Sequence, residues 1–403
     1  MALIVQKFGG SSVADAQRVS HVAGIIANTY RQGNQVVVVV SAQGKTTDHL
    51  IAQAQEVNPN PSKRELDALM ATGELASMAL MALALERLGM PAISLSGWQA
   101  GIHTDSTHGA ARVSRIDTER LRNELDKGNI VIVAGFQGVN KYEDITTLGR
   151  GGSDTSAVAL AAALNADLCQ IYTDVDGVYT ADPRIVPNAI KIDEITYDEM
   201  LELASQGAGV LHNRSVELAK KFRVDLEVLS SLERKPGTKV KEVTKVEKTT
   251  IAGVAKDTSI ARIALIGLRH NPGVAFQVFD LLSKHNINVD LILQSIGRED
   301  SKDISFTVHE KDLEDARAIL TENQEVLCFD HIEVDGNIGK VSIVGAGLMT
   351  NCGMAARMFE ALYEAGINIQ MINTSEIRVS VLLDEGDVDR AVRAIHAKFF
   401  DEI

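Results

Sequence analysis

Two glycine-rich turns are the parts of this sequence best suited to chemistry. The first, Lys7-Phe-Gly-Gly-Ser-Ser-Val13, directly follows an expected strand and precedes a helical pattern. Its glycines let the backbone approach an anion closely, and free N–H groups at the helix start can bind phosphate oxygens. Lys7 would balance the charge of a transferring phosphoryl group, although a tight turn with a solvated lysine is the alternative. The turn matches neither GxGxxG nor GxxxxGKS, so it indicates neither a Rossmann dinucleotide site nor a P-loop.

The second turn, at 148–156, precedes a helical pattern that begins near Ser156. It carries four residues that could bind an anion, Arg150, Gly151, Gly152 and Ser153, and the carboxylate of Asp154. Arg150 can bind a carboxylate through two parallel hydrogen bonds. Asp154 can orient Lys7 or a metal ion, or it can cap the helix. Two such turns at strand-to-helix junctions favour two anionic ligands, a nucleotide and an acidic acceptor.

Three further places carry polar groups at expected strand ends or helix starts. Tyr179 in the polar loop 173–184 could stack on a base and Arg184 could reach phosphates, although satisfied turn residues are the alternative. The aspartates of this loop lack the spacing of an EF-hand calcium loop. Glu74 enters the most apolar helical pattern, where a substrate ammonium group or a helix-terminal role would suit it. Ser41 and Thr47 follow the strand at 36–40, where open α/β sheets bind ligands.

Several other chemistries lack their residues. The ten histidines show no HExxH or paired-ligand spacing, so metal ligation is not predicted. Cys169, Cys328 and Cys352 include no CxxC pair, which argues against a disulfide framework and a cysteine zinc site. Cys169 stands in an apolar strand pattern and no GxSxG motif occurs, so a covalent nucleophile is not predicted either.

The elements that must position these residues alternate between short β-branched runs and helical patterns. Strands are predicted at 3–6, 36–40, 130–134 and 169–173, and helices at 16–30, 65–88, 117–126 and 156–164. This order predicts an α/β sandwich around a largely parallel sheet. The helix at 65–88 is apolar on nearly every side after Met70, which predicts a buried helix.

An internal repeat follows a charged linker that ends near Lys248. At an offset of 80 residues, Gly267 aligns with Gly347 and Phe279 with Phe359. Each copy predicts a β-α-β-β-α unit, with second strands at 304–308 and 379–383 and second helices at 312–320 and 387–397. Two copies of this length indicate a tandem duplication of ferredoxin-like modules rather than a solenoid.

Composition narrows the class of protein. The 403 residues carry a formal net charge of −14 without a Lys/Arg cluster, so no nucleic-acid partner is expected. No apolar run reaches the roughly 18–20 residues of a membrane span, and the first residues do not form a signal peptide. We therefore expect a cytoplasmic protein with no membrane partner.

Together, four motifs closely resemble those of the aspartokinases, a branch of the amino acid kinase family: KFGGSSV at 7–13, ATGE at 71–74, TTLGRGGSDTS at 146–156 and YTDVDGVYTADPR at 172–184. The repeat resembles the paired ACT modules of that family, which sense amino acids. The resemblance implies an α/β three-layer sandwich at 1–245, a linker and strand at 246–262 that would complete the second module, and ferredoxin-like ACT α+β modules at 263–335 and 338–403. The implied activity is ATP-dependent phosphorylation of the β-carboxylate of L-aspartate, the first step toward lysine, threonine, methionine and diaminopimelate.

The resemblance also implies site residues. The nucleotide site would comprise Lys7, Phe8, Gly9, Gly10, Thr173, Asp174, Tyr179 and Arg184. The aspartate site would comprise Ser41, Thr47, Glu74, Arg150, Gly151, Gly152 and Ser153. Lys7, Arg150 and Asp154 would be catalytic, and Mg²⁺ would enter with ATP without protein ligands. No strong general base is needed, because the acceptor carboxylate is already ionised at neutral pH.

An amino-acid effector, lysine and/or threonine, is expected at the ACT modules, which would also join copies of the chain into a homo-oligomer. The implied effector residues are His270, Asn271, Gly273, Val274, Ala275, Asn288, Asp290, Gln294, Ala355, Ile369, Gln370 and Glu376. Three positions depart from many relatives: Gly209 replaces a lysine that approaches the nucleotide, His270 replaces an aspartate and Ala355 replaces a hydroxyl residue. The last two changes weaken the case for threonine, and lysine, lysine with threonine, or no feedback stay open.

Two other functions are compatible with parts of the pattern. A kinase for glutamate, N-acetylglutamate or carbamate would share the glycine turns but lack the ACT repeat and the setting of Glu74. A non-catalytic amino acid sensor would have no reason to keep Lys7, Arg150 and Asp154 together.

Overall fold

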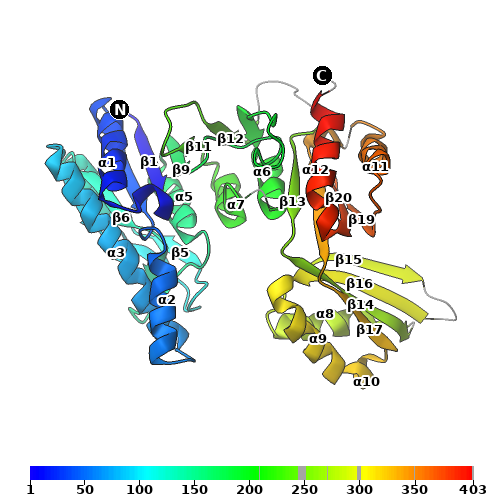
Figure 1. Cartoon of the computed structure of the whole chain (residues 1–403). Helices are drawn as coiled ribbons and strands as arrows, with labels where there is room; N and C mark the ends of the chain where they lie inside the picture. Colours follow the sequence, from blue (N-terminus) through cyan, green and yellow to red (C-terminus); the bar gives the residue numbers. More distant parts are fainter. Residues whose placement is uncertain (208, 244–250, 270, 297–300, 349, 402–403) are drawn as a thin grey trace. The chain divides into compact units, whose positions relative to one another are not determined.

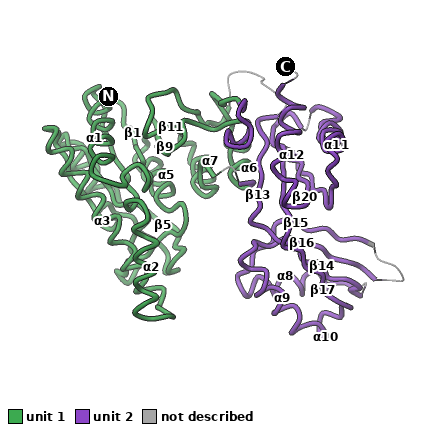
Figure 2. Tube along the Cα trace, viewed as in Figure 1, with its two compact units in different colours: residues 1–179, 190–205, 209–248 green, residues 180–189, 206–208, 249–403 purple. Residues whose placement is uncertain are grey.

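The computed structural model describes residues 1–207, 209–243, 251–269, 271–296, 301–348 and 350–401. The chain forms two compact units (Figure 2). Unit 1 comprises 1–179, 190–205 and 209–248, and unit 2 comprises 180–189, 206–208 and 249–403. Two short segments of the expected domain at 1–245 therefore belong to unit 2.

An eight-stranded sheet in the order β10-β12-β11-β9-β1-β2-β6-β3 is the centre of unit 1 (Figure 1). Its strands are β1 Leu3–Phe8, β2 Gln35–Val40, β3 Ala92–Leu95, β6 Ile130–Ala134, β9 Leu168–Thr173, β10 Glu194–Thr196, β11 Leu226–Ser230 and β12 Thr238–Lys241. The strands from β11 to β3 are parallel, and β12 is antiparallel to β11. The carboxyl ends of β11, β9, β1, β2 and β6 consequently meet at one edge, where open α/β sheets bind ligands.

Helices cover both faces of this sheet, which makes unit 1 a three-layer sandwich (Figure 1). The helices are α1 Ala16–Arg31, α2 Thr46–Val57, α3 Lys63–Arg87, α4 Glu119–Asp126, α5 Gly152–Leu164, α6 Tyr197–Ser205 and α7 Asn213–Phe222. Apolar residues of α1, α3 and β2 form one core, and the buried face of α5 packs against β1, β2 and β9. Asp15 accepts a hydrogen bond from the Arg18 N–H at 2.8 Å, so α1 begins at a side-chain cap.

A second, small sheet in unit 1 was not predicted. Its order is β5-β4-β7-β8, with β4 Ile102–Thr104, β5 Val113–Ile116, β7 Gln137–Val139 and β8 Ile145–Thr147. Strands of three or four residues are too short to display a period-two pattern, so the sequence contains no usable signal for them.

Helix α3 corrects two sequence predictions. It is not buried all round: Leu80 and Leu83 are 42% and 59% exposed, whereas the opposite face buries Met81 and Leu85. By length and composition α3 could also cross a membrane, which contradicts the expectation that no segment is long enough. Core helices pass the same test, and α3 packs against α1, β6 and β8 within unit 1.

Unit 2 holds two four-stranded antiparallel sheets, each with its own helices (Figure 1). The first sheet, β15-β16-β14-β17, consists of β14 Ile260–Arg269, β15 Val289–Ile296, β16 Ser301–His309 and β17 His331–Asp335, with α8 Val274–Lys284, α9 Leu313–Glu322 and α10 Gln324–Leu327. The second, β13-β18-β20-β19, consists of β13 Gly253–Asp257, β18 Ile338–Val344, β19 Met371–Thr374 and β20 Arg378–Asp384, with α11 Met354–Glu364 and α12 Val388–His396. Since β13 pairs with β18, the second module takes one strand from before the first module.

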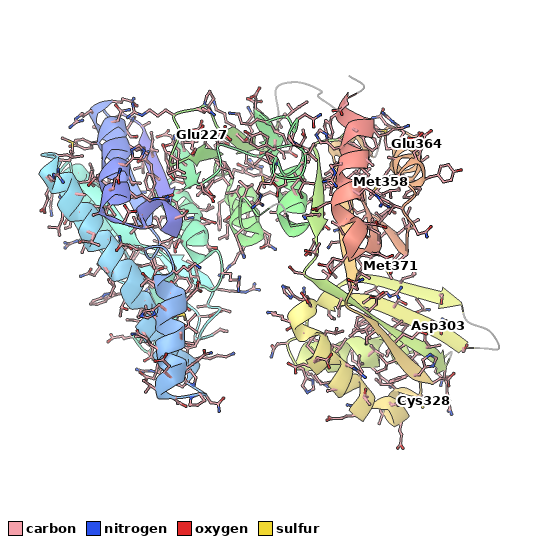
Figure 3. The ribbon with its side chains drawn as sticks, viewed as in Figure 1. Glu227, Asp303, Cys328, Met358, Glu364 and Met371 are labelled. Atoms are coloured by element: carbon pink, nitrogen blue, oxygen red, sulfur yellow. The ribbon has the colours of Figure 1, made fainter. Side chains whose placement is uncertain are left out.

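The core of the second module includes chain from the polar loop of the N-terminal half. Met358 of α11 lies in this core (Figure 3), and so do Ala181 and Val186. The N–H of Val254 donates to the Thr180 carbonyl at 2.7 Å, and Thr180 Oγ1 lies 2.9 Å from His396 Nε2. The loop that begins after β9 is therefore divided between the two units at residues 179 and 180.

Candidate active site

Lys7 lies at the carboxyl edge of the large sheet, on the face covered by α5. Side chains alternate along a strand, so Phe8 points to the opposite face, into the core that contains α1. Lys7 Nζ lies 2.6 Å from Asp154 Oδ1, with only 11% and 13% of the two side chains exposed. Helix α5 begins after Gly151 with no side-chain cap. Of the two roles open to Asp154, the geometry thus supports the pairing with Lys7.

The first glycine turn forms a 3-10 helix, Gly10–Val13, held against its neighbours. A Cβ on Gly10 would lie 2.6 Å from the Ala42 carbonyl oxygen, so the close approach of the turn after β2 requires glycine there. Ser12 Oγ donates to Ser231 Oγ at 2.7 Å, which in turn donates to the Thr173 carbonyl at 3.1 Å. These bonds tie the ends of β1, β11 and β9 together. Because the Phe8 ring is fully buried and stacks on Tyr172, only the Phe8 main chain can serve a nucleotide.

The second glycine turn leads into α5 four residues earlier than predicted, at Gly152 instead of near Ser156. Gly149 and Gly151 have φ of +77° and +66°, conformations that favour glycine. Ser153 and Asp154 consequently belong to the first turn of the helix, where N–H groups lack intrahelical partners and favour anions. The Arg150 side chain is exposed. This end of α5 can therefore present an arginine, a hydroxyl and free N–H groups to one anionic ligand.

Two residues at the start of α7 hold this turn, and sequence reasoning assigned a role to neither. A Cβ on Gly151 would lie 2.2 Å from His212 Cγ, so the imidazole packs directly on the glycine. Burial lowers the pKa of His212, and the nearby Asp154 charge opposes that shift. Arg214 donates to the Leu148 carbonyl at 2.8 Å and to the Ala111 carbonyl at 2.7 Å. The one signal in the sequence was position: His212 ends the segment 207–212, in which Gly209 stands where the resemblance leads one to expect a lysine.

Glu74 is the buried carboxylate nearest the turn after β2. Its Oε1 accepts a hydrogen bond from the Ala42 N–H at 3.0 Å. Helix α3 can come this close because Gly73 has no side chain; a Cβ there would lie 2.8 Å from the Ala42 Cβ. Glu74 Oε2 is buried without a hydrogen-bond partner among the described residues. Burial raises the pKa of Glu74 to about 7, although the Ala42 N–H opposes the shift. Ser41 and Thr47, both partly buried, flank Ala42 at the end of β2 and the start of α2.

The predicted nucleotide residues are divided between the two units. At the end of β9, Thr173 Oγ1 donates to Asp174 at 3.0 Å, and in the following loop the Tyr179 hydroxyl donates to Asp176 at 2.7 Å. This hydrogen bond raises the pKa of Tyr179 to about 12. Arg184, by contrast, belongs to unit 2, where it pairs with Asp182 at 2.7 Å. Its place at the nucleotide site stays a prediction. Gly209 is exposed.

The predicted effector residues lie at equivalent places in the two modules of unit 2. Gly273 and Gly353, with φ of +95° and +89°, precede α8 and α11. Asn271, Val274 and Ala275 lie at the start of α8, and Ala355 lies at the start of α11. The other predicted effector residues lie on or beside strands β15, β19 and β20: Asn288, Asp290, Gln294, Ile369, Gln370 and Glu376. Asp290 already pairs with the buried Lys340 at 2.5 Å, and Gln370 donates to Asp384 at 2.6 Å. His270 lies outside the described residues.

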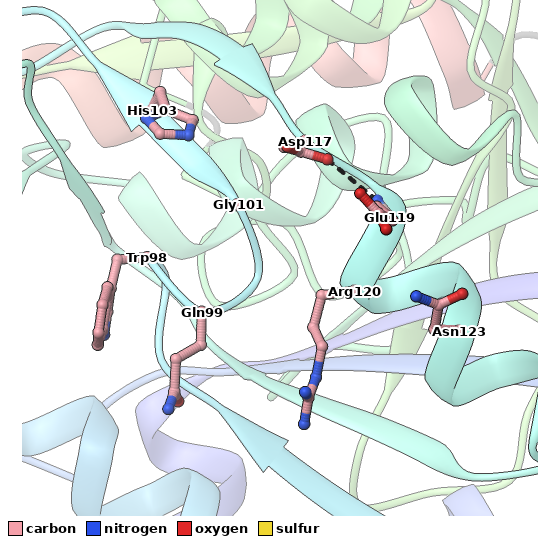
Figure 4. Close-up of a pocket in the computed structure, with 8 residues that line it drawn as sticks. All are labelled: Trp98, Gln99, Gly101, His103, Asp117, Glu119, Arg120 and Asn123. Carbon is pink, nitrogen blue, oxygen red and sulfur yellow. Dashed lines mark hydrogen bonds between the residues drawn. The ribbon is translucent and has the colours of Figure 1, made fainter.

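A further hollow of about 300 Å³ lies between β4 and α4 in unit 1 (Figure 4). Its lining consists of Trp98, Gln99, Gly101, His103, Asp117, Glu119, Arg120 and Asn123, none of which was predicted as a site residue. In the part of the chain that the structure describes, no group of three or more His, Cys, Asp or Glu side chains could hold a metal ion.

Comparison with known proteins decides the family. The model of the amino acid kinase family matches residues 2–230, and the ACT domain model matches 263–324 and 341–399. Aspartokinase 2 of Bacillus subtilis is 50% identical over 400 residues, which cover 99% of this chain and 98% of the relative. The chain belongs to the aspartokinases of the amino acid kinase family. The expected family, fold class and function as an aspartate kinase with ACT domains are thereby confirmed.

Solved structures agree with this membership. E. coli aspartokinase III in complex with aspartate and ADP, described as its R-state, is similar with a TM-score of 0.85 and 27% identity. The match covers 99% of this chain and 100% of that one. The same enzyme with lysine and aspartate, its T-state, has a TM-score of 0.78 over 99% of each chain, also at 27% identity.

Proposed function

We propose that L-aspartate and MgATP bind at the carboxyl edge of the eight-stranded sheet, where the γ-phosphoryl group passes to the β-carboxylate and gives 4-phospho-L-aspartate. The observation that carries this proposal is the pairing of Lys7 with Asp154, at 2.6 Å, between two glycine turns. The complex of E. coli aspartokinase III with aspartate and ADP supports aspartate and an adenine nucleotide as the ligands.

Charge cancellation is the main task of such a site, because both reactants are anions. Lys7 lies near the end of β1, where the first glycine turn begins, and contacts Asp154 of the second turn, so its ammonium group can balance the charge that moves from nucleotide to acceptor. Asp154 would hold that ammonium group in place through the ion pair at 2.6 Å. Mg²⁺ bound to the phosphate oxygens would supply further positive charge.

We assign the ends of L-aspartate to groups on opposite sides of the site. The buried Glu74 Oε2, which lacks a partner among the described residues, would accept the substrate ammonium group. Arg150 would bind a carboxylate with two parallel hydrogen bonds. The remaining contacts would come from hydroxyls and N–H groups of Ser41, Thr47, Gly151, Gly152 and Ser153.

The nucleotide would occupy the neighbouring part of the same edge, beyond β1, β9 and β11. N–H groups of the first glycine turn suit phosphate oxygens. The assigned residues are Lys7, the Phe8 main chain, Gly9, Gly10, Thr173, Asp174, Tyr179 and Arg184. The glycine at position 209 would cost this site one charged contact.

The ACT modules would bind an amino-acid effector, lysine and/or threonine, and would join copies of the chain. The lysine complex of E. coli aspartokinase III supports the first assignment. Strands β15 and β19 are at the edges of their sheets, with Ile292 and Ile372 49% and 46% exposed, and such strands favour pairing with another chain. The product would feed the synthesis of lysine, threonine, methionine and diaminopimelate in the cytoplasm.

A coupled ADP-release assay tests the proposal. We expect ADP release that requires both L-aspartate and MgATP and that lysine or threonine inhibits. Lys7→Ala should abolish turnover, while Lys63→Ala, an exposed lysine at the start of α3, should not change it. Normal turnover by a folded Lys7→Ala protein would rule out the role given to Lys7, and release without aspartate would rule out the acceptor.

A further inference from the structure

Asp67 is a fully buried carboxylate that none of the motifs included. It lies on α3, and its exposed fraction is 0%. Its two oxygens accept from the Gly109 N–H at 2.9 and 3.1 Å, the Thr147 N–H at 3.1 Å and the Thr147 hydroxyl at 2.6 Å. His108 Nδ1 lies 3.0 Å from Oδ2. Each of these groups can donate a hydrogen bond, and a buried carboxylate needs such donors to offset the loss of its hydration.

These contacts join three parts of the chain that are distant in sequence. Asp67 belongs to α3, His108 and Gly109 belong to the β4–β5 loop at 105–112, and Thr147 ends β8. The Ala111 N–H also donates to the Thr147 carbonyl at 2.9 Å, so the loop is paired with the end of the strand. From the other side, Arg214 binds the carbonyls of Leu148 and Ala111. Thr147 and Leu148, where the second glycine turn begins, are thus held by hydrogen bonds from both α3 and α7 as well as from the β4–β5 loop.

The positions along the chain connect this cluster to both ends of the aspartate site. Glu74 follows Asp67 by seven residues on α3, which places both on the same face of the helix about 10 Å apart. Arg150 follows Thr147 by three residues. One carboxylate therefore fixes the helix that carries Glu74 relative to the turn that carries Arg150.

We propose that Asp67 is a positioning residue for the acceptor: it sets the spacing between the group that binds the ammonium end of L-aspartate and the arginine that binds a carboxylate. The inference rests on the substrate-site assignment above. Asp67 itself does not touch the substrate. Because a small misplacement of reacting groups costs much of the rate, a change in this cluster should act on the acceptor and leave the nucleotide alone.

Two substitutions at the cluster and one matched control test the proposal. Asp67→Asn replaces one accepting oxygen by an NH₂ group, which faces other hydrogen-bond donors and cannot accept from them. Thr147→Val removes the hydroxyl that donates to Asp67 and changes the shape of the side chain little. Thr146→Val is the control, because Thr146 is equally buried on the same strand but pairs with Thr104 at 2.6 Å instead of Asp67. KM for aspartate and for ATP, kcat and the melting temperature are measured for each full-length variant.

We expect kcat/KM for aspartate to fall about tenfold to hundredfold in Asp67→Asn, and by a smaller factor in Thr147→Val, with KM for ATP within about twofold of the parent. Thr146→Val should lower the melting temperature and keep both KM values. If Asp67→Asn does not fold, the comparison of KM for aspartate between Thr147→Val and Thr146→Val tests the proposal. Equal KM values for aspartate in those two variants, or equal rises in KM for both substrates, would overturn the proposal.

The substrate-site assignment is checked separately. Glu74→Gln and Arg150→Ala should each raise KM for aspartate. If they do so while the Asp67 and Thr147 variants do not, only the positioning role is wrong. If neither of them changes KM for aspartate, the assignment itself fails and the positioning role fails with it.

Discussion

The main-chain N–H of Ala42 donates a hydrogen bond to Glu74 Oε1 at 3.0 Å, so the turn after β2 and helix α3 meet at one buried carboxylate. The other oxygen of that carboxylate is buried without a partner among the described residues. Desolvation disfavours the charged form, and the pKa of Glu74 is raised to about 7. A bound ammonium group would restore the charged form.

The pH dependence of aspartate use follows from this pKa. Glu74 must be ionised to accept an ammonium group, so kcat/KM for aspartate should fall about tenfold per pH unit below pH 7. Glu74→Gln should lower the plateau and remove this limb of the profile. Glu65→Gln, a change of an exposed glutamate on the same helix, should keep it. The same acidic limb in Glu74→Gln as in the parent would contradict the assignment.

Because of this raised pKa, the free energy of unfolding of the ligand-free protein should depend on pH. A carboxyl group whose folded pKa is raised from 4.5 to about 7 binds its proton more tightly in the folded state. The stability contributed by the neutral group is complete below about pH 4.5 and is lost as pH rises to about 7. In urea unfolding, Glu74→Gln should therefore gain stability relative to the parent between pH 5 and pH 8. A difference between the two proteins that does not change over this range would contradict the prediction.

The charge on Asp154 should matter more than its shape. Asp154→Asn keeps the size of the side chain but leaves Lys7 without its ion-pair partner at 2.6 Å. We expect kcat to fall about 10²–10³-fold, the range found when one preorganised charge-stabilising group is removed. The matched control is Asp198→Asn, which breaks the exposed pair with Lys220 and should leave kcat unchanged. An unchanged kcat in Asp154→Asn would show that the charge of this carboxylate is not needed for catalysis.

Gly151 should not tolerate a side chain. Its φ of +66° is unfavourable for alanine, and a Cβ would lie 2.2 Å from His212 Cγ. Gly151→Ala should therefore displace the second glycine turn and weaken aspartate binding. Gly24→Ala provides the contrast, because a Cβ there meets nothing within 4 Å inside α1 and should stabilise the protein by about 0.5–1 kcal/mol. Thermal unfolding and KM for aspartate distinguish the two, and normal KM in a folded Gly151→Ala protein would count against the site.

Asp290 should contribute to stability as well as to any effector site. Lys340 is only 2% exposed, and without Asp290 its nearest described carboxylate would be Asp257 at 3.9 Å. Asp290→Ala should lower the free energy of unfolding by about 1–2 kcal/mol, below the usual cost of breaking a buried pair because Asp290 is 40% exposed. Repeating the substitution in a Lys340→Met background should cost much less, and an equal cost in both backgrounds would contradict the role of the pair.

The sequence by itself determined the family, the largely parallel sheet, the two repeated modules and the glycine turns, because each depends on local composition and spacing. The strand at 130–134 matches β6 to the residue, and α1 begins at Ala16 as predicted. Errors fell where local pattern is ambiguous: α3 is apolar in sequence yet leaves Leu83 exposed, and α5 begins at Gly152 because an αL glycine, not a side chain, precedes it.

Only the tertiary structure decided which distant groups meet. Lys7 and Asp154 are 147 positions apart in the chain, and their contact depends on β1 and α5 packing face to face. The packing of His212 on Gly151 and the cluster around Asp67 likewise require contacts between elements far apart in sequence. Local periodicity contains no information on such pairings. They arise because buried polar groups find partners wherever the packing of the core brings donors and acceptors together.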